Sequence, residues 1–201
     1  EGTPPVVYPL TYKSIEHNID AYAAFSELYR QTGEAQYTAA ADSAKAFIHS
    51  MYDATTSVFY TGTESDGVTP SKDNIVLDAQ VWAALALGED FSPYQTALAR
   101  VSEMRQPEGG YPFCQRNENG GWWAEGTAYT ALLYRNLGET DAAKAALDAL
   151  VSVQLEGGLF PAATVDNLST GFELFTGEPR VYASDAHIAP TAWFILALKD
   201  F

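Results

Sequence analysis

The feature that most constrains this chain is a repeated pair of helix-like segments joined by a short glycine turn. Apolar residues recur at helical spacing in residues 14–32, and a second apolar stripe follows in residues 34–51. Gly33 separates the two segments, in the position where a helix commonly ends with a left-handed residue. A connection this short makes successive helices antiparallel neighbours. The sequence therefore predicts a helical hairpin over residues 14–51.

The same pairing of helices recurs along the rest of the chain. The further predicted helices span residues 74–87, 92–105, 125–137, 141–154 and 188–198. Gly88 and Gly138 end the first helix of two of these pairs, and Ser92-Pro93 is suited to the cap and first turn of a second helix. The last predicted helix stands without a partner.

The first helix of each pair is more apolar than the second. Trp82 and Trp193 lie at helix-interior spacing and are expected in the core, whereas Lys45, Arg100 and Lys144 belong to second helices or to their continuation. A helix enclosed by others is apolar, and a helix wet on one side carries charge. The links from second to first helices are long and rich in Gly, Pro, Trp and Asn. Long loops within a compact domain are usually functional.

A short sequence repeat supports stacked units. Residues 106–112 (QPEGGYP) recur as residues 154–161 (QLEGGLFP), and residues 52–62 resemble a degenerate third copy. Both clear copies follow a second helix. Repetition at a spacing of about 50 residues is typical of stacked supersecondary units.

Composition excludes several classes of partner. A net charge of −15 repels nucleic acid and anionic membranes, and no apolar run is long enough to span a bilayer. Cys114 is the single cysteine, which excludes an internal disulfide and a multi-cysteine metal site. We expect no cofactor and no metal. The chain opens at Glu1 with no leader pattern, so a leader has been removed or the chain begins mid-protein.

The Gln-x-Glu-Gly-Gly-aromatic loops between alternating helices resemble those of α/α-toroid proteins. One branch of that group is the six-hairpin glycosidase-like superfamily of glycoside hydrolases, lyases and sugar epimerases, and the other is the terpenoid-cyclase and prenyltransferase group. Residues 15–20 (IEHNID), 122–128 (WWAEGTA) and 187–194 (HIAPTAWF) resemble bacterial members of the first branch. The resemblance covers nearly the whole chain. It implies an all-α fold, an α/α toroid of antiparallel helical hairpins.

The predicted ring is incomplete. A six-hairpin toroid needs six inner and six outer helices, whereas residues 1–201 supply about four inner and three outer ones. The chain is therefore predicted to be a single α/α-toroid domain or the C-terminal part of one. An N-terminal segment or a second chain would complete the ring. The resemblance also favours a bacterial extracytoplasmic location.

The resemblance places the active site in the funnel where the inner helices begin. The predicted helix starts carry acids, histidines, amides and tryptophans: Glu16, His17, Asn18 and Asp20; Asp73, Asn74 and Asp78; Trp122, Trp123 and Glu125; and Asp185 and His187. Cleavage of a glycosidic bond needs one carboxylic acid to protonate the leaving oxygen and a second carboxylate to activate water or attack. Aromatic rings beside them would stack on sugar faces.

Three carboxyl groups are the catalytic candidates. Glu125 follows two tryptophans and precedes the small residues of a helix start. It is the first choice for general acid or base. Asp20 and Asp78 lie in apolar stretches, where an unpaired carboxylate is costly. The alternative is that these groups bond the local backbone. For Glu16, stabilisation of the helix dipole is an equally valid interpretation.

The remaining candidates would bind substrate. Trp122 and Trp123 cannot easily share one core, so at least one is expected to face the cleft. His17 and His187 would hydrogen-bond sugar hydroxyl groups or serve as helix caps. Tyr111 packs under the repeated glycine loop or reaches the funnel. The predicted substrate-binding set is completed by Glu16, Asn18 and Asp185.

These residues favour a carbohydrate-active enzyme that acts on a neutral or mildly charged saccharide. The reaction expected first is glycoside hydrolysis, with a lyase or a sugar epimerase as related possibilities. The alternative is a non-catalytic module that binds a saccharide or a protein through the same face. Isoprenoid chemistry is disfavoured, because the cyclase Asp-rich acid motif is absent and Cys114 lies outside an inner-helix start.

Overall fold

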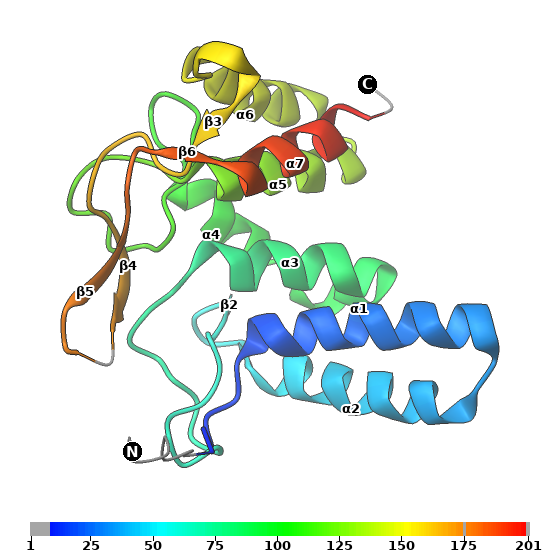
Figure 1. The fold of residues 1–201 in the computed structure, drawn as a ribbon. Helices are drawn as coiled ribbons and strands as arrows, with labels where there is room; N and C mark the ends of the chain where they lie inside the picture. The colour runs from blue at the N-terminus through cyan, green and yellow to red at the C-terminus, as the bar shows by residue number, and fades with distance from the viewer. Residues whose placement is uncertain (1–8, 175, 200–201) are drawn as a thin grey trace, which may run out of the picture.

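A computed structural model describes residues 9–174 and 176–199, and helical hairpins dominate it (Figure 1). The helices are α1 (Ile15–Thr32), α2 (Ala35–Ser50), α3 (Leu77–Leu87), α4 (Ala97–Met104), α5 (Ala124–Asn136), α6 (Thr140–Ser152) and α7 (Ile188–Leu198), with short 3-10 helices η1 (Gly88–Tyr94) and η2 (Glu156–Gly158). The predicted all-α class is confirmed. Within these ranges, no helix has both the length and the apolar character needed to cross a bilayer.

The first hairpin shows how local chemistry sets the helix ends. The Ser14 side chain accepts a hydrogen bond from the backbone N–H of His17 and so caps α1. At the other end, Gly33 adopts a left-handed φ of 71° and donates its N–H to the Tyr29 carbonyl. The chain then reverses directly into α2. The predicted hairpin is confirmed.

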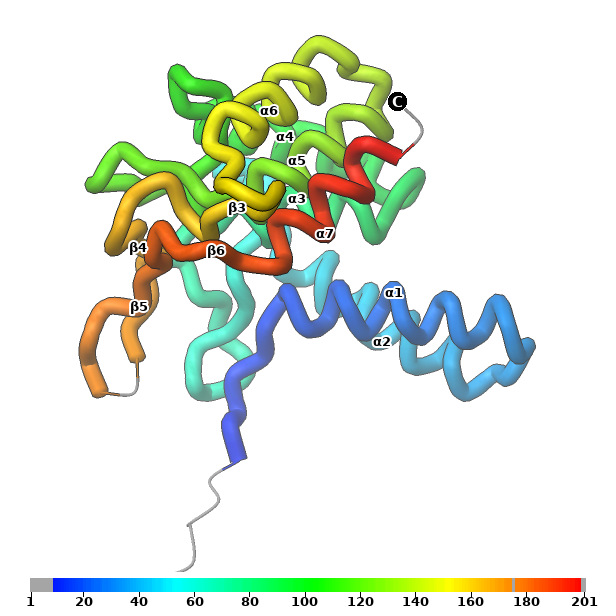
Figure 2. The backbone as a smooth tube through the Cα atoms, turned by 45° about the horizontal axis from the view of Figure 1, so that its top comes forward, coloured from blue at the N-terminus to red at the C-terminus, as the bar shows by residue number. Residues whose placement is uncertain are grey.

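The helices form an inner and an outer set. Helices α1, α3, α5 and α7 contact one another in chain order and begin at the same end of the molecule (Figures 1 and 2). Helices α2, α4 and α6 pack against α1, α3 and α5 respectively. The side chains of α3 and α5 are almost all buried or half-buried, as expected of enclosed helices. The alternation predicted from the sequence is confirmed.

Two predicted helix starts were wrong. Helix α3 begins at Leu77 rather than Asn74, because the preceding backbone bonds a neighbouring loop: Leu77 N–H donates to the Phe113 carbonyl, and Gln115 N–H donates to the Ile75 carbonyl. Pro93 lies inside η1, so Ser92 does not cap α4.

The long links carry short antiparallel strands, which were not predicted. The paired strands are β1 (Tyr52–Asp53) with β2 (Val58–Phe59), β3 (Phe160–Pro161) with β6 (Ala186–His187), and β4 (Leu168–Glu173) with β5 (Pro179–Tyr182). In the β4–β5 hairpin, Leu168 pairs with Tyr182 and Ser169 pairs with Val181. This hairpin lies at the end of the molecule where the inner helices begin (Figure 1).

A buried glutamine ties one of these strands to the inner layer. The Gln80 side chain accepts from the Phe59 N–H and donates to the Phe59 carbonyl, each at 2.8 Å. The amide thus satisfies the backbone of β2 inside the core, where an unpaired peptide group would be costly.

Candidate active site

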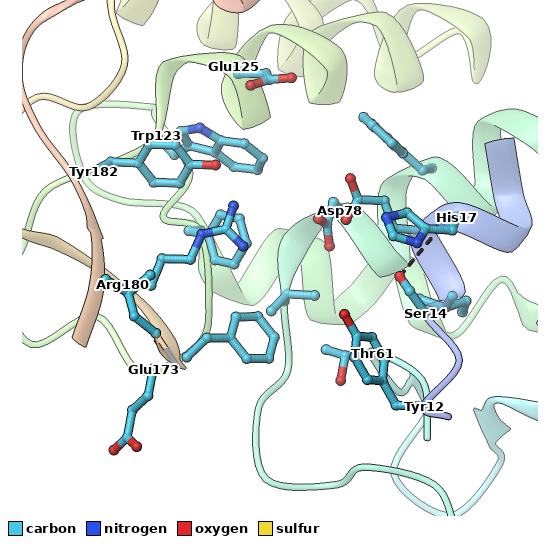
Figure 3. Close-up of a pocket in the computed structure, with 17 residues that line it drawn as sticks. Tyr12, Ser14, His17, Thr61, Asp78, Trp123, Glu125, Glu173, Arg180 and Tyr182 are labelled. Atoms are coloured by element: carbon cyan, nitrogen blue, oxygen red, sulfur yellow. Dashed lines mark hydrogen bonds between the residues drawn. The ribbon is translucent and has the colours of Figure 1, made fainter. Parts of the chain in front are cut away.

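A cavity of about 620 Å³ lies where the inner helices begin (Figure 3). Its walls come from the first turns of α1, α3 and α5, from the loops that precede them, and from the β4–β5 hairpin. The lining residues are Tyr12, Ser14, Ile15, Glu16, His17, Thr61, Val76, Asp78, Trp82, Phe113, Trp123, Glu125, Phe172, Glu173, Leu174, Arg180 and Tyr182. The cavity therefore occupies the predicted funnel.

Three inner helices each contribute one carboxyl group from the first turn. These are Glu16 on α1, Asp78 on α3 and Glu125 on α5. Asp78 is only 7% exposed, and its Oδ1 accepts a hydrogen bond of 2.6 Å from the Ala79 N–H. Glu125 is half-buried. Figure 3 shows Asp78 and Glu125 on different sides of the cavity.

The pKa of Asp78 is well above the usual value for an aspartic acid. Burial raises the pKa of Asp78 to about 7, with a further rise from the nearby Glu16 carboxyl group. The hydrogen bond from the Ala79 N–H opposes this rise, and so does the positive charge of Arg180. Near neutral pH a substantial fraction of Asp78 is consequently protonated and able to act as an acid.

Glu125 is perturbed in the same direction. Burial raises its pKa, the Trp193 indole N–H opposes that rise, and the Glu16 carboxyl group adds to it. A carboxyl group with a raised pKa is suited to giving or taking a proton in general acid–base chemistry. Among the described residues, no three His, Cys, Asp or Glu side chains are grouped so as to hold a metal ion.

Aromatic rings form one wall of the cavity. The Trp123 and Tyr182 rings stack at 5.4 Å with an interplanar angle of 25°, and Phe113 lies 4.7 Å from Trp123. The Tyr182 hydroxyl is directed toward the cavity in Figure 3. Such a wall offers an apolar surface to a sugar ring next to groups that hydrogen-bond its hydroxyls.

The β4–β5 hairpin supplies the part of the site that the sequence did not predict. Arg180 extends its guanidinium group toward the centre of the cavity, whereas the Glu173 carboxylate points away (Figure 3). The hairpin is anchored below by Asn74, whose amide donates to the Thr170 carbonyl at 2.8 Å. Gly177, with a φ of 81°, makes the turn. In the sequence, Gly177 was the local sign of a turn here, and it did not indicate which neighbouring residues would line the cavity.

Five of the predicted site residues line the cavity: Glu16, His17, Asp78, Trp123 and Glu125. Trp82, which was expected only in the core, packs on the core and also lines the cavity. The prediction for Trp82 was incomplete, because the first turns of the enclosed helix α3 also border the cavity.

The other predicted residues lie outside the cavity lining. Asp20 is exposed on α1, and the Asn18 amide donates to the Ser14 carbonyl. Trp122 is buried against Gly110. Asp185 is exposed, and its carbonyl accepts from the Ala162 N–H.

Tyr111 and His187 take the structural alternatives considered for them. Tyr111 is 1% exposed, and its hydroxyl donates to that of Tyr134 at 3.4 Å. His187 accepts from the Ala189 N–H at the start of α7 and so caps that helix. Tyr111 lies in a loop and His187 at a helix start, and each side chain bonds a neighbouring protein group.

The fold is similar to that of several solved α/α-toroid structures. No family model and no curated protein matches the chain. Among solved structures, a possible member of the GH105 family from Salmonella enterica superposes with a TM-score of 0.70 at 13% identity, covering 94% of this chain and 56% of that one. A glycosyl hydrolase of family 88 from Bacteroides vulgatus gives 0.66 at 17%, covering 95% and 63%.

Enzymes of other reaction classes share the fold. The cellobiose 2-epimerase from Spirochaeta thermophila superposes with a TM-score of 0.59 at 16% identity, covering 86% of this chain and 49% of that one. The chain thus spans less than two thirds of the length of these three structures. The predicted incomplete α/α toroid is confirmed, and the shared fold does not select one reaction.

Proposed function

We propose that this protein is a carbohydrate-active enzyme that cleaves a glycosidic bond, with Asp78 as general acid and Glu125 as the second carboxylate. One observation carries the proposal: a buried carboxyl group, Asp78, and a half-buried one, Glu125, border one aromatic-walled cavity from adjacent inner helices. The cavity volume of about 620 Å³ is within the roughly 300–1,000 Å³ range of small-molecule sites. The solved structures that share this fold include glycoside hydrolases of families 88 and 105.

The proposed chemistry gives the two groups different roles. Asp78 would donate its proton to the leaving glycosidic oxygen, since burial keeps that proton in place near neutral pH. Glu125 would then activate water or attack the anomeric carbon. The stacked rings of Trp123 and Tyr182 would hold the sugar ring between the two carboxyl groups.

The charge of the lining favours a neutral or mildly charged saccharide. Glu16, Asp78, Glu125 and Glu173 are acidic, while Arg180 is the single Arg or Lys among the lining residues. The net charge of the whole chain, −15, acts in the same direction. A densely anionic polymer would be repelled.

The test is a panel of neutral and uronate-containing oligosaccharides, assayed with the unmodified protein and three variants. We expect Asp78→Asn and Glu125→Gln to lower kcat/KM by about 10²- to 10⁴-fold on any substrate turned over. Asp20→Asn is the matched control, because Asp20 is an acid on α1 outside the cavity; we expect it to stay within about twofold. Full activity in both cavity variants would remove the acid pair from the mechanism.

Product analysis separates the alternatives. Hydrolysis adds water to the products, a lyase leaves an unsaturated sugar, and an epimerase changes one stereocentre without breaking the chain. Saccharide binding without turnover by the unmodified protein would favour the non-catalytic module instead.

A further inference from the structure

The cavity has a second wall that the proposed chemistry leaves without a role. Its residues come from the start of α1, from the segment before that helix and from the loop after β2: Tyr12, Ser14, His17 and Thr61. We call these four residues the α1-side wall. Figure 3 shows the α1-side wall across the cavity from Trp123 and Tyr182, with Asp78 lying between the two groups.

Backbone hydrogen bonds hold the α1-side wall in place. The Ile15 N–H donates to the Thr61 carbonyl at 3.0 Å, and the Thr63 N–H donates to the Lys13 carbonyl at 2.9 Å. The Thr63 hydroxyl in turn accepts from the Lys13 N–H at 2.9 Å. Gly62 has a φ of 145°, and a Cβ atom there would collide with the Lys13 carbonyl oxygen. A glycine at this position therefore lets the two segments meet at one edge of the cavity.

Tyr12 and Thr61 present groups that suit a sugar. Tyr12 is 45% exposed, and Figure 3 shows its hydroxyl directed into the cavity. Within the described part of the chain, neither hydroxyl bonds a protein group, since the bonds that hold the wall use backbone atoms and Thr63. A tyrosine ring offers an apolar face with a polar tip, and convergent hydroxyls of this kind orient a ligand in a pocket.

We propose that the α1-side wall is a second sugar-binding site, which holds the sugar on the leaving side of the bond that is cleaved. The first sugar would lie against Trp123 and Tyr182 and the second against Tyr12, with the glycosidic oxygen near Asp78. The preferred substrate then contains at least two sugar units. This assignment rests on the proposed function, because it needs cleavage beside Asp78.

The size of the cavity agrees with two sugar units. Its volume of about 620 Å³ is in the range of sites that hold drug-sized ligands, which are larger than one hexose.

The second sugar is expected to be uncharged. Arg180 is the single Arg or Lys among the lining residues, and it lies on the other side of the cavity, with Trp123 and Tyr182 (Figure 3). The α1-side wall contains no Lys or Arg, and Glu16 precedes His17 on α1. An anionic sugar at this wall would therefore meet an acid and no cationic Arg or Lys partner.

The competing explanation is that the α1-side wall only closes the cavity. Tyr12→Ala separates the two, because it removes the ring and the hydroxyl from an exposed position and leaves the backbone bonds of the wall in place. Tyr29→Ala is the matched control. Tyr29 is 46% exposed, lies on α1 and is outside the cavity lining.

The test compares each disaccharide of the panel with the methyl glycoside of its non-reducing sugar. We expect Tyr12→Ala to lower kcat/KM about tenfold for the disaccharide and to leave that for the methyl glycoside within about twofold, since the methyl glycoside has no second sugar to lose. Tyr29→Ala is expected to change neither. Calorimetry in the Asp78→Asn background measures binding alone, and there Tyr12→Ala is expected to weaken the disaccharide about tenfold and the monosaccharide within about twofold.

The outcomes separate this inference from the proposed function. Equal effects of Tyr12→Ala on both substrates, or no effect on the disaccharide, would assign the wall to closing the cavity and overturn the inference. Selective loss of disaccharide binding in a protein that cleaves no saccharide would keep the sugar contact at Tyr12 and reject the proposed function.

A second variant covers the case in which Tyr12→Ala does not fold. Thr61→Val removes the other hydroxyl of the wall and keeps the shape of the side chain. It is expected to weaken the disaccharide about threefold relative to the monosaccharide, as the loss of one hydrogen bond. An unchanged ratio in Thr61→Val would then count against the second sugar-binding site.

Discussion

At the residue scale, Asp78 shows how burial changes the ionisation of an ordinary first-turn acid. An exposed acid in the same position would ionise readily and stabilise the helix dipole. Asp78 instead lies beneath the rim, with the Glu16 and Glu125 carboxyl groups among its neighbours. Its ionisation is therefore penalised in the folded protein, and this couples the protonation of Asp78 to the stability of the fold.

The stability of the protein is expected to fall as the pH rises toward 7 because of this residue. The pKa of Asp78 is about 7 in the folded chain and about 3.9 in an unfolded one. Between these two pKa values the folded state binds more protons than the unfolded state. The stability that Asp78 contributes is therefore full below about pH 3.9, is lost as the pH rises through about 7, and changes no further above that.

Asp78→Asn removes this dependence. Relative to the unmodified protein, we expect the variant to gain up to about 3 kcal/mol in free energy of unfolding between pH 5 and pH 8. Urea unfolding of both proteins at the two pH values measures the difference. Identical pH slopes would show that Asp78 ionises normally in the folded state.

At the element scale, the close approach of α5 to α3 depends on a glycine. A Cβ atom at Gly126 would lie 2.5 Å from the Trp123 ring and 2.8 Å from a Leu77 methyl group. Both neighbours are buried side chains with little room to move. The glycine therefore keeps the two helices, and with them Asp78 and Glu125, at their present separation.

Gly126→Ala is a sharp test of that contact. Alanine is the better helix former by about 1 kcal/mol, whereas overpacking typically costs about 1–3 kcal/mol. We expect a net loss of stability in chemical unfolding and a weaker fluorescence signature of a buried Trp123. Stabilisation of the size predicted by helix propensity would show that the neighbouring side chains move aside.

The helices themselves were largely predictable, and the strands were not. Ser14 and Gly33 mark their helix ends through bonds made within a few residues, so the pattern in the sequence is sufficient. The start of α3 depends on Phe113, about forty positions along the chain, and the β4–β5 hairpin depends on Asn74. No local periodicity records contacts at such distances.

At the scale of the whole molecule, the last inner helix, α7, is exposed on one side. Helix α7 contacts α5, yet Ile188 and Ile195 are 75% and 61% exposed. Completion of the ring by an N-terminal segment or a second chain stays a prediction. It also stays a prediction that residues 1–201 form a single toroid domain or the C-terminal part of one.

Ile195→Lys tests whether copies of the chain cover this face. Because the side chain is exposed, we expect the 201-residue chain to change in stability by less than about 0.5 kcal/mol. Its mass in sedimentation is expected to equal that of the unmodified chain. A larger loss of stability together with a smaller mass would show that a second copy packs on α7.

The sequence by itself determined the helical hairpins and their inner and outer alternation, since these follow from turn glycines and side-chain spacing within single helices. The rim as the place of the site came from the resemblance to α/α toroids and stays a prediction. The sequence did not distinguish Asp78 from Asp20, because both are acids in apolar stretches of predicted inner helices. Tertiary structure decided that difference. Packing of α3 between α1 and α5 buries Asp78 and leaves Asp20 exposed, and the β4–β5 hairpin brings Arg180 and Tyr182 to the cavity.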